Sequence, residues 1–197
     1  MNKKEQNKML RNTLIILGVV IISFVFFIIA SNALKNFEYR GVKFSVVKFC
    51  DAGPPCLITY NTKLPVVYQG KSTDYNFFLR NDPRELEKEV PFDGEVVLRN
   101  KMDVNITFNT ACNGLETIAV ENFLKLHRIA GINISNDNNK GCDLTGGKMY
   151  LSIQESNQTS IEQFGPACYR INVKECEILK GTERFMIETF VEIDKTL

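Results

Sequence analysis

An uninterrupted apolar segment near the N-terminus limits how this chain of 197 residues can fold. Between Arg11 and Lys35 no side chain is charged, and most residues are Leu, Ile, Val or Phe. Roughly 20 apolar helical residues cross the roughly 30 Å hydrocarbon core of a bilayer, because each adds about 1.5 Å. Residues 12–34 are therefore predicted to form a transmembrane helix, which would make the lipid bilayer a partner of this chain.

Basic residues flank this segment unevenly, and their distribution predicts its orientation. Two basic residues follow it closely, Lys35 and Arg40, whereas four precede it: Lys3, Lys4, Lys8 and Arg11. The flank richer in Lys and Arg normally stays in the cytoplasm. We expect residues 1–11 to be a cytoplasmic tail and residues 37–197 to be an extracytoplasmic domain of a single-pass protein in the cell membrane.

A cleaved signal peptide is the alternative interpretation of the same segment. The small residues of "SNA" at 31–33 resemble a signal peptidase site. Against this, the apolar run is longer than the roughly 7 to 15 residues of a usual signal core, so an uncleaved anchor is favoured. Both interpretations place the same domain on the same side of the membrane.

The exported part has the size of one domain and carries no excess of basic residues. Its roughly 160 residues suffice for a single hydrophobic core. The chain has 24 basic and 23 acidic residues, and removing the four basic and one acidic residues of the tail leaves a formal charge of −2. A nucleic-acid partner is therefore not expected, because such proteins carry a strongly basic surface.

All six cysteines fall in the exported part, at positions 50, 56, 112, 142, 168 and 176. An even number of cysteines in an oxidising compartment is typical of disulfides. A zinc site would need Cys-x2-Cys spacing or histidine partners, but His127 is the only histidine. We therefore predict disulfides among Cys50, Cys56, Cys112, Cys142, Cys168 and Cys176, and neither a metal site nor a cofactor.

The pairing of these cysteines is open from the sequence. Proximity favours Cys50 with Cys56, Cys112 with Cys142, and Cys168 with Cys176. However, "CYRINV" alternates as a half-buried strand does, and eight extended steps would separate its flanking cysteines by roughly 26 Å. A disulfide needs Cα atoms within about 7 Å. Either the chain reverses near Asn172 and the local bond forms, which we favour, or both cysteines bond elsewhere, with Cys112 and Cys142.

The pattern of the domain predicts an α+β fold: one disulfide-stabilised domain with a mixed or antiparallel sheet and two main helices. Alternating apolar residues predict strands over 42–46 and within 57–80, and further strands are expected over 94–100, 103–108, 149–156 and 168–173.

Three helices are predicted in this domain. Asp82 as N-cap, followed by Pro83 and Glu85, marks the start of a short one. A 3.6-residue period from Leu115 ends at a C-cap glycine, Gly131. The last helix is expected over 182–195, with Thr182 as its N-cap.

Three sequence strings, "LRNDPRELEKEVPF", "GPACYRINVKECEI" and "TERFMIETFVEI", resemble those of an uncharacterised group of archaeal single-pass membrane proteins with an exported cysteine-containing domain. The resemblance spans most of the exported part. It implies single-pass topology and a location in the cell envelope, and it implies no activity.

Few residues have the pattern of a catalytic or binding site. Arg80, Asp82 and Arg84 are a candidate recognition patch for carboxylate or phosphate, although a capped turn with paired arginines explains them equally simply. His127 is expected to be a surface or capping residue rather than a catalyst. The segment "GCDLTGGK" around Asp143 lacks the alternating carboxylates of a calcium-binding loop.

Glutamates 177, 183 and 188 lie near the last helix and could include a general acid. Solvent-facing positions on that helix are the simpler expectation for them. Asn105, Asn133 and Asn157 begin N-x-S/T sequons and are candidate glycosylation sites in an exported domain. Asn157 is the best of the three, because it falls in an expected loop, whereas the strings "DVNITF" and "GINIS" around the other two also fit strands.

The shortage of catalytic motifs favours a non-catalytic function. We expect a membrane-anchored binding or envelope-interaction module, whose partner is an envelope protein or a small ligand. An extracytoplasmic hydrolase that uses carboxylates is the alternative. A pilin-like filament subunit ranks third, because no basic-Gly or basic-Ala processing site directly precedes the apolar run.

Overall fold

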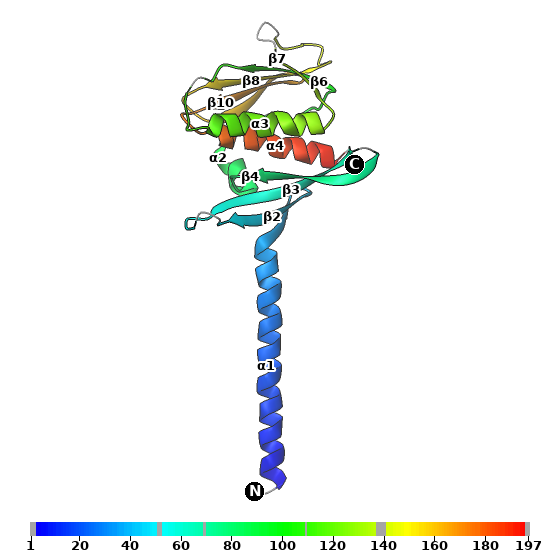
Figure 1. Cartoon of the computed structure of the whole chain (residues 1–197), viewed down its shortest axis with the longest axis vertical. Coiled ribbons are helices and arrows are strands. Elements are labelled where there is room, and N and C mark those ends of the chain that lie inside the picture. Colours follow the sequence, from blue (N-terminus) through cyan, green and yellow to red (C-terminus); the bar gives the residue numbers. More distant parts are fainter. Residues whose placement is uncertain (1–2, 51–52, 69, 109, 137–140, 196–197) are drawn as a thin grey trace. The chain divides into compact units, whose positions relative to one another are not determined.

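The computed structural model describes residues 3–50, 53–68, 70–108, 110–136 and 141–195, and the chain divides into two compact units, Met1–Phe37 and Glu38–Leu197. The first unit consists mainly of helix α1 (Lys3–Lys35), labelled in Figure 1. Its segment Asn12–Ala30 is long and apolar enough to cross a membrane, and none of that segment is buried within the structure. The helix covers the whole predicted segment 12–34 and fits a membrane anchor.

The second unit begins with a four-stranded sheet of order β1-β2-β3-β4. Its strands are β1 (Asn36–Tyr39), β2 (Val42–Phe49), β3 (Leu57–Tyr68) and β4 (Lys71–Leu79). Arg40 and Gly41, with φ of 52° and 90°, form the two-residue turn between β1 and β2, where such left-handed values are required. The inner face of this sheet buries Phe44, Leu64 and Phe77.

A six-stranded mixed sheet follows, with order β5-β9-β10-β8-β6-β7. Its strands are β5 (Phe92–Asp93), β6 (Lys101–Ile106), β7 (Asn133–Asn136), β8 (Met149–Glu155), β9 (Ser160–Gly165) and β10 (Cys168–Val173). Strand β10 lies parallel to β8 and antiparallel to β9, and β6 is parallel to both β7 and β8. The predicted strand over 168–173 is confirmed, and Tyr169, Ile171 and Val173 are fully buried.

Helices α3 (Leu115–Ile129) and α4 (Ile178–Asp194) lie between the two sheets of this unit (Figure 1), and the short helix α2 (Pro83–Glu89) contacts α4. Helix α4 contacts both sheets. The ring of Phe190 lies 5.4 Å from Phe77 of β4, and the ring of Phe185 lies 5.1 Å from Tyr169 of β10. A Cβ atom at Gly181 would come within 2.8 Å of Ile171, so this glycine permits a close approach of α4 to β10. The predicted α+β class is confirmed.

Two of the three predicted helix ends are confirmed. Asp82 caps α2 by accepting a hydrogen bond from the backbone N–H of Arg84, and Gly131 follows α3 with a φ of +80°. The prediction that Thr182 caps the last helix is wrong. Helix α4 begins at Ile178, and the Thr182 hydroxyl donates to the Ile178 carbonyl inside the first turns.

The predicted strand over 94–100 is also wrong, because this segment does not join either sheet. Side chains of the six-stranded sheet satisfy part of its backbone instead. The Tyr169 hydroxyl accepts from the Val97 N–H at 2.7 Å and donates to the Glu95 carbonyl at 3.0 Å. Gln163 accepts from the Glu95 N–H.

All six cysteines are paired, as Cys50–Cys56, Cys112–Cys176 and Cys142–Cys168. The prediction of Cys50–Cys56 is confirmed, whereas the favoured local bond between Cys168 and Cys176 and the proximity pair Cys112–Cys142 are wrong. Strand β10 continues without reversal to Val173, so its flanking cysteines stay too far apart to bond. The alternative, in which both bond with Cys112 and Cys142, is the observed one.

Candidate binding face

The outer face of the six-stranded sheet, which points away from α3 and α4, carries polar and aromatic side chains. Strand register places Arg170 of β10 beside Ser152 of β8, and Ser152 beside Asn105 of β6. The members of this "polar face" come from β6, β8, β9 and β10: Asn105, Tyr150, Ser152, Gln154, Ser160, Glu162, Phe164, Arg170 and Asn172.

Asn172 organises one half of the polar face. Its side-chain oxygen accepts from Gln154 Nε2 at 3.1 Å, and its side-chain nitrogen donates to Ser160 Oγ at 3.2 Å and to Glu162 Oε1 at 3.1 Å. Only 6% of Asn172 is exposed, so this amide is held in one orientation by its neighbours. The hydrogen bonds fix Gln154 and Glu162 at the surface around it.

The aromatic rings of Phe164 and Tyr150 lie in the other half of the polar face. The Arg170 guanidinium lies 4.8 Å from the centre of the Phe164 ring and 3.4 Å from a Glu162 oxygen. Phe164, of which 40% is exposed, meets the buried Tyr150 edge to face at 6.2 Å. The Tyr150 hydroxyl accepts from the Asn105 side-chain nitrogen at 3.4 Å. An exposed ring is thus fixed beside charged and amide groups.

Two buried atoms of the polar face lack a partner among the residues that the structure describes. They are the acceptor Asn105 Oδ1 and the donor Arg170 Nε. An unsatisfied buried polar group is costly, and such groups are normally completed by water or a ligand. Because Asn105 and Arg170 flank the small Ser152, an acceptor and a donor without partners among the described residues lie on either side of one short side chain.

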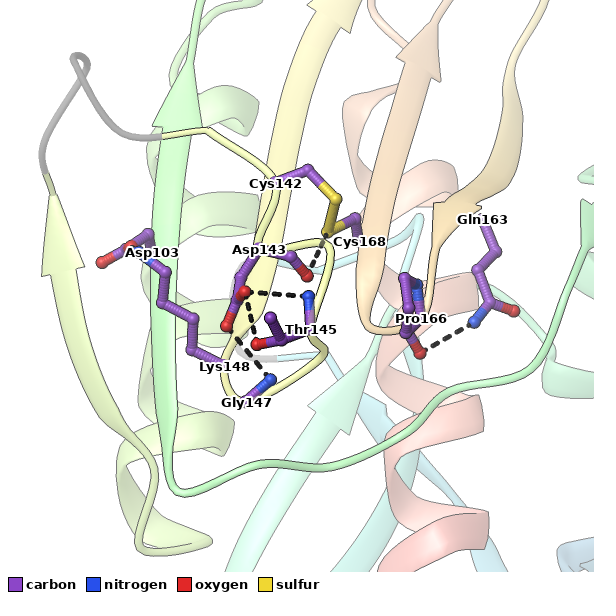
Figure 2. Close-up of a disulfide and its surroundings, with 9 residues drawn as sticks. All are labelled: Asp103, Cys142, Asp143, Thr145, Gly147, Lys148, Gln163, Pro166 and Cys168. Atoms are coloured by element: carbon purple, nitrogen blue, oxygen red, sulfur yellow. Dashed lines mark hydrogen bonds and ion pairs between the residues drawn. A yellow bond between two sulfur atoms is a disulfide. The ribbon is translucent and has the colours of Figure 1, made fainter.

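A disulfide-bonded loop lies beside the start of β10, as Figure 2 shows. Cys142 bonds to Cys168, the first residue of β10. The Asp143 carboxylate accepts from Thr145 N and Oγ1 and from Gly147 N, at 2.7 to 3.1 Å, and these bonds, first that from the Thr145 hydroxyl, lower the pKa of Asp143. The loop is thereby fixed from within.

Lys148 at the end of this loop pairs with Asp103 of β6, which is nearly buried. Within the described part of the chain, no group of three or more His, Cys, Asp or Glu side chains is placed to hold a metal ion.

The predicted patch of Arg80, Asp82 and Arg84 is occupied by local structure. Both Asp82 oxygens accept from the Arg84 guanidinium, at 2.9 and 2.6 Å. Burial alone would raise the pKa of Asp82, but the hydrogen bonds from Arg84 outweigh it and lower the pKa. The Arg80 backbone N–H is bound by Glu183. The simpler interpretation, a capped turn, therefore describes the observed contacts.

The expectation that the glutamates of the last helix face solvent is wrong for two of them. Glu183 and Glu188 are 2% and 6% exposed. Glu183 accepts from the backbone N–H groups of Arg80 and Asn81 and from the Asn81 amide, at 2.7 to 2.9 Å. Burial raises the pKa of Glu183 to about 7.

Glu188 and the third candidate, Glu177, also have partners. Glu188 pairs with Arg184 and Arg40. Glu177, at the start of α4, accepts from the Thr159 hydroxyl at 2.6 Å, and this bond, with that from Lys180, lowers its pKa. The oxygens of Glu183 and Glu188 thus contact the protein interior, where they anchor loops to α4.

The prediction of His127 as a surface or capping residue is wrong, because the side chain is buried completely and contacts a carbonyl within α3 rather than at its end. Its ring packs against Phe123 and Phe185, with Nδ1 2.8 Å from the Phe123 carbonyl and Nε2 3.4 Å from the Thr189 hydroxyl. Burial lowers the pKa of His127 to about 4. The imidazole is therefore a neutral core side chain at neutral pH.

The three sequons lie in different settings. Asn105 is within β6 and part of the polar face, whereas Asn133 is exposed at the start of the edge strand β7. Asn157 is exposed in the turn between β8 and β9. Of the three, Asn157 keeps the most accessible position outside the sheet, and glycosylation at any of them stays a prediction.

The fold and the polar face together define a class: an α+β domain that follows an apolar helix long enough to cross a membrane, contains three disulfides, and displays a polar and aromatic sheet surface. No protein-family model matches this chain, and no curated protein or solved structure is significantly similar to it.

Proposed function

We propose that this chain is a single-pass protein of the cell membrane whose disulfide-bonded domain is a saccharide-binding module outside the cell. The basic N-terminal flank supports an N-terminus in the cytoplasm, and the three disulfides support an oxidising compartment for the domain. This topology agrees with the resemblance to the archaeal membrane group, which stays a prediction.

One observation carries the proposal: Arg170 Nε and Asn105 Oδ1, a donor and an acceptor without partners in the described residues, flank Ser152 on a surface that also exposes Phe164. A sugar hydroxyl donates and accepts hydrogen bonds, so a saccharide offers both the acceptor and the donor that these two atoms lack. The apolar face of a sugar ring packs against an aromatic ring such as Phe164.

The charges of the polar face favour a neutral or weakly charged ligand. Arg170 is paired with Glu162, so neither sign dominates the surface. The amides of Gln154 and Asn172 are fixed by their mutual hydrogen bond, so little side-chain entropy is lost when a ligand binds. Hydroxyl-rich ligands suit this set of groups better than phosphates or nucleic acids.

Binding of the full-length chain in detergent micelles to arrays of immobilised neutral and acidic oligosaccharides tests the proposal. We expect at least one neutral saccharide class to bind, and Phe164→Ala or Arg170→Ala to weaken its binding by about 30-fold, because truncating a central contact typically costs about 2 kcal/mol.

A blocking variant with a matched control locates the binding surface. Ser152→Gln places a longer side chain between Asn105 and Arg170 without removing either, so we expect it to abolish binding. Ser45→Gln makes the same change on β2, at a position of similar intermediate exposure in the other sheet, and should leave binding unchanged. Equal affinities for wild type and Ser152→Gln would contradict the proposal.

A further inference from the structure

The tip of the β2–β3 hairpin exposes apolar side chains on both of its faces. Phe49 at the end of β2 lies opposite Leu57 at the start of β3, and Ile58 points to the other face. These three residues and Phe78 of β4 are each 41% to 44% exposed. The Phe49 and Phe78 rings contact each other, with centroids 5.7 Å apart. We call these four residues the apolar tip.

The described residues between Phe49 and Leu57 extend this surface. Gly53, Pro54 and Pro55 are exposed, and the Cys50–Cys56 disulfide closes the loop. Clustered exposed aromatic and aliphatic residues on a soluble surface mark contact with a protein or a membrane. The disulfide holds the two strands together, so the apolar residues are presented as one rigid unit.

Chain connectivity limits how far this tip can lie from a bilayer that α1 crosses. Strand β1 begins at Asn36, directly after the last residue of α1, Lys35. Lys35 is only five residues, or about 7.5 Å of helix, beyond the membrane-crossing segment, which is about the thickness of one headgroup layer. The first residue of the domain therefore starts at the membrane surface if α1 is retained as an anchor.

Strand β2 then runs back along β1. The two-residue turn at Arg40 and Gly41 makes these neighbouring strands antiparallel, and β1 has four residues whereas β2 has eight. The last four residues of β2 therefore continue past the start of β1 by about 13 Å. Phe49 is thus within the reach of the headgroup layer by chain length alone.

The charges near the apolar tip also favour contact with the membrane. Lys43 and Lys48 are exposed on β2, and Lys48 directly precedes Phe49. Exposed aromatic rings with nearby Lys side chains are typical of segments that lie in the membrane–water interface, where the ammonium groups meet lipid phosphates. Such an arrangement does not require a partner protein.

We infer that the apolar tip inserts into the headgroup layer of the membrane that α1 crosses, so that the domain contacts the bilayer at a second point besides its anchor. The contact restricts the rotation of the domain on its tether and directs the polar face of the other sheet to a constant orientation. This inference rests on the anchor and not on saccharide binding.

Tryptophan scanning of the full-length chain tests it, because the natural sequence contains no tryptophan. Phe49→Trp, Phe78→Trp and the control Phe164→Trp each replace a phenylalanine of about the same exposure. The proteins are reconstituted in vesicles of phosphatidylcholine and phosphatidylglycerol, with or without a nitroxide on the phosphatidylcholine headgroup. Non-reducing mass analysis first verifies that the three disulfides have formed in each variant.

We expect nitroxide lipid to quench about half or more of the emission at positions 49 and 78 and little at 164, because quenching acts over roughly 10 Å, the depth range of interfacial segments. The quenching should not change when the protein is diluted with lipid. Absence of quenching at 49 and 78, or equal quenching at all three positions, overturns the inference. Blue-shifted emission that depends on protein density, without quenching by lipid, assigns the tip to a second copy of the chain and also overturns it.

Discussion

Replacing Cys112 and Cys176 with serine is expected to lower the free energy of unfolding by about 4 kcal/mol, because this disulfide closes a loop of 64 residues in the unfolded chain. The bond joins the segment before α3 to the segment before α4, so its loss also frees the starts of the two long helices that pack against each other. Urea unfolding of the full-length chain in detergent micelles, followed by near-ultraviolet circular dichroism, measures the change.

The Cys50→Ser/Cys56→Ser variant is the matched control for this prediction. Its disulfide has a sequence separation of 6, so loop-closure entropy gives it only about 2 kcal/mol. Equal losses in the two double variants would contradict the argument from loop length. Peptide mapping without reduction should link Cys112 to Cys176, and a Cys168–Cys176 peptide would refute the observed pairing directly.

The second large effect is a pair of opposing pH dependences inside the core. The pKa of Glu183 rises from 4.5 to about 7 on folding, so its contribution to stability is complete below pH 4.5 and is lost as the pH rises through 7. The pKa of His127 falls from 6.5 to about 4, so its contribution is complete above pH 6.5 and is lost as the pH falls through 4. Between pH 4.5 and 6.5 the two effects nearly cancel.

Replacing only one of the two groups should therefore reveal the pH dependence of stability that the other group causes. Relative to wild type, Glu183→Gln should gain about 2 to 3 kcal/mol of stability as the pH rises from 4.5 to 6.5, because it removes the opposing carboxylate. His127→Asn, which keeps a donor for the Phe123 carbonyl, should lose about the same amount over this range.

Unfolding midpoints at several pH values between 4.5 and 7 measure these slopes. The double variant is the control, because its stability should follow the shallow dependence of wild type. Single variants whose pH profiles run parallel to that of wild type would show that neither group titrates in the folded core as described.

Local signals in the sequence identified features that depend on a few adjacent residues. The charge-free segment after Arg11, the Asp82 cap and the glycine after α3 each rest on short-range chemistry. The alternation in "CYRINV" correctly indicated a strand, in which Arg170 and Asn172 of the polar face alternate with the buried Tyr169, Ile171 and Val173.

Features that depend on register between distant segments were not predictable. Asn105, Ser152 and Arg170 come from three strands that the chain connects through other elements, and only their pairing makes them neighbours. The disulfide pairing was not predictable for the same reason, because the packing of α3 against α4 brings Cys112 and Cys176 together.

The burial of α4 is not predictable from its sequence for a related reason. A helix covered on one side shows a single apolar stripe, and charged residues outside the stripe are then expected to face water. Helix α4 lies between two sheets, so Glu183 and Glu188 face protein rather than water. Backbone N–H groups bind the Glu183 carboxylate, and two arginines pair with the Glu188 carboxylate. In the sequence, the i,i+4 spacing of Arg184 and Glu188 is the local signal for the ion pair between these two residues.

The central claim, that the outer face of the six-stranded sheet binds saccharide, is tested most directly by photocrosslinking. A photoreactive phenylalanine analogue is placed at position 164, or as a control at position 63, which is exposed on β3 of the other sheet and lies outside the apolar tip. Irradiation with the oligosaccharide selected on the arrays should give a covalent adduct of the expected mass at 164 and none at 63. An adduct at 63 alone, or at neither position while the saccharide is bound, would contradict the claim.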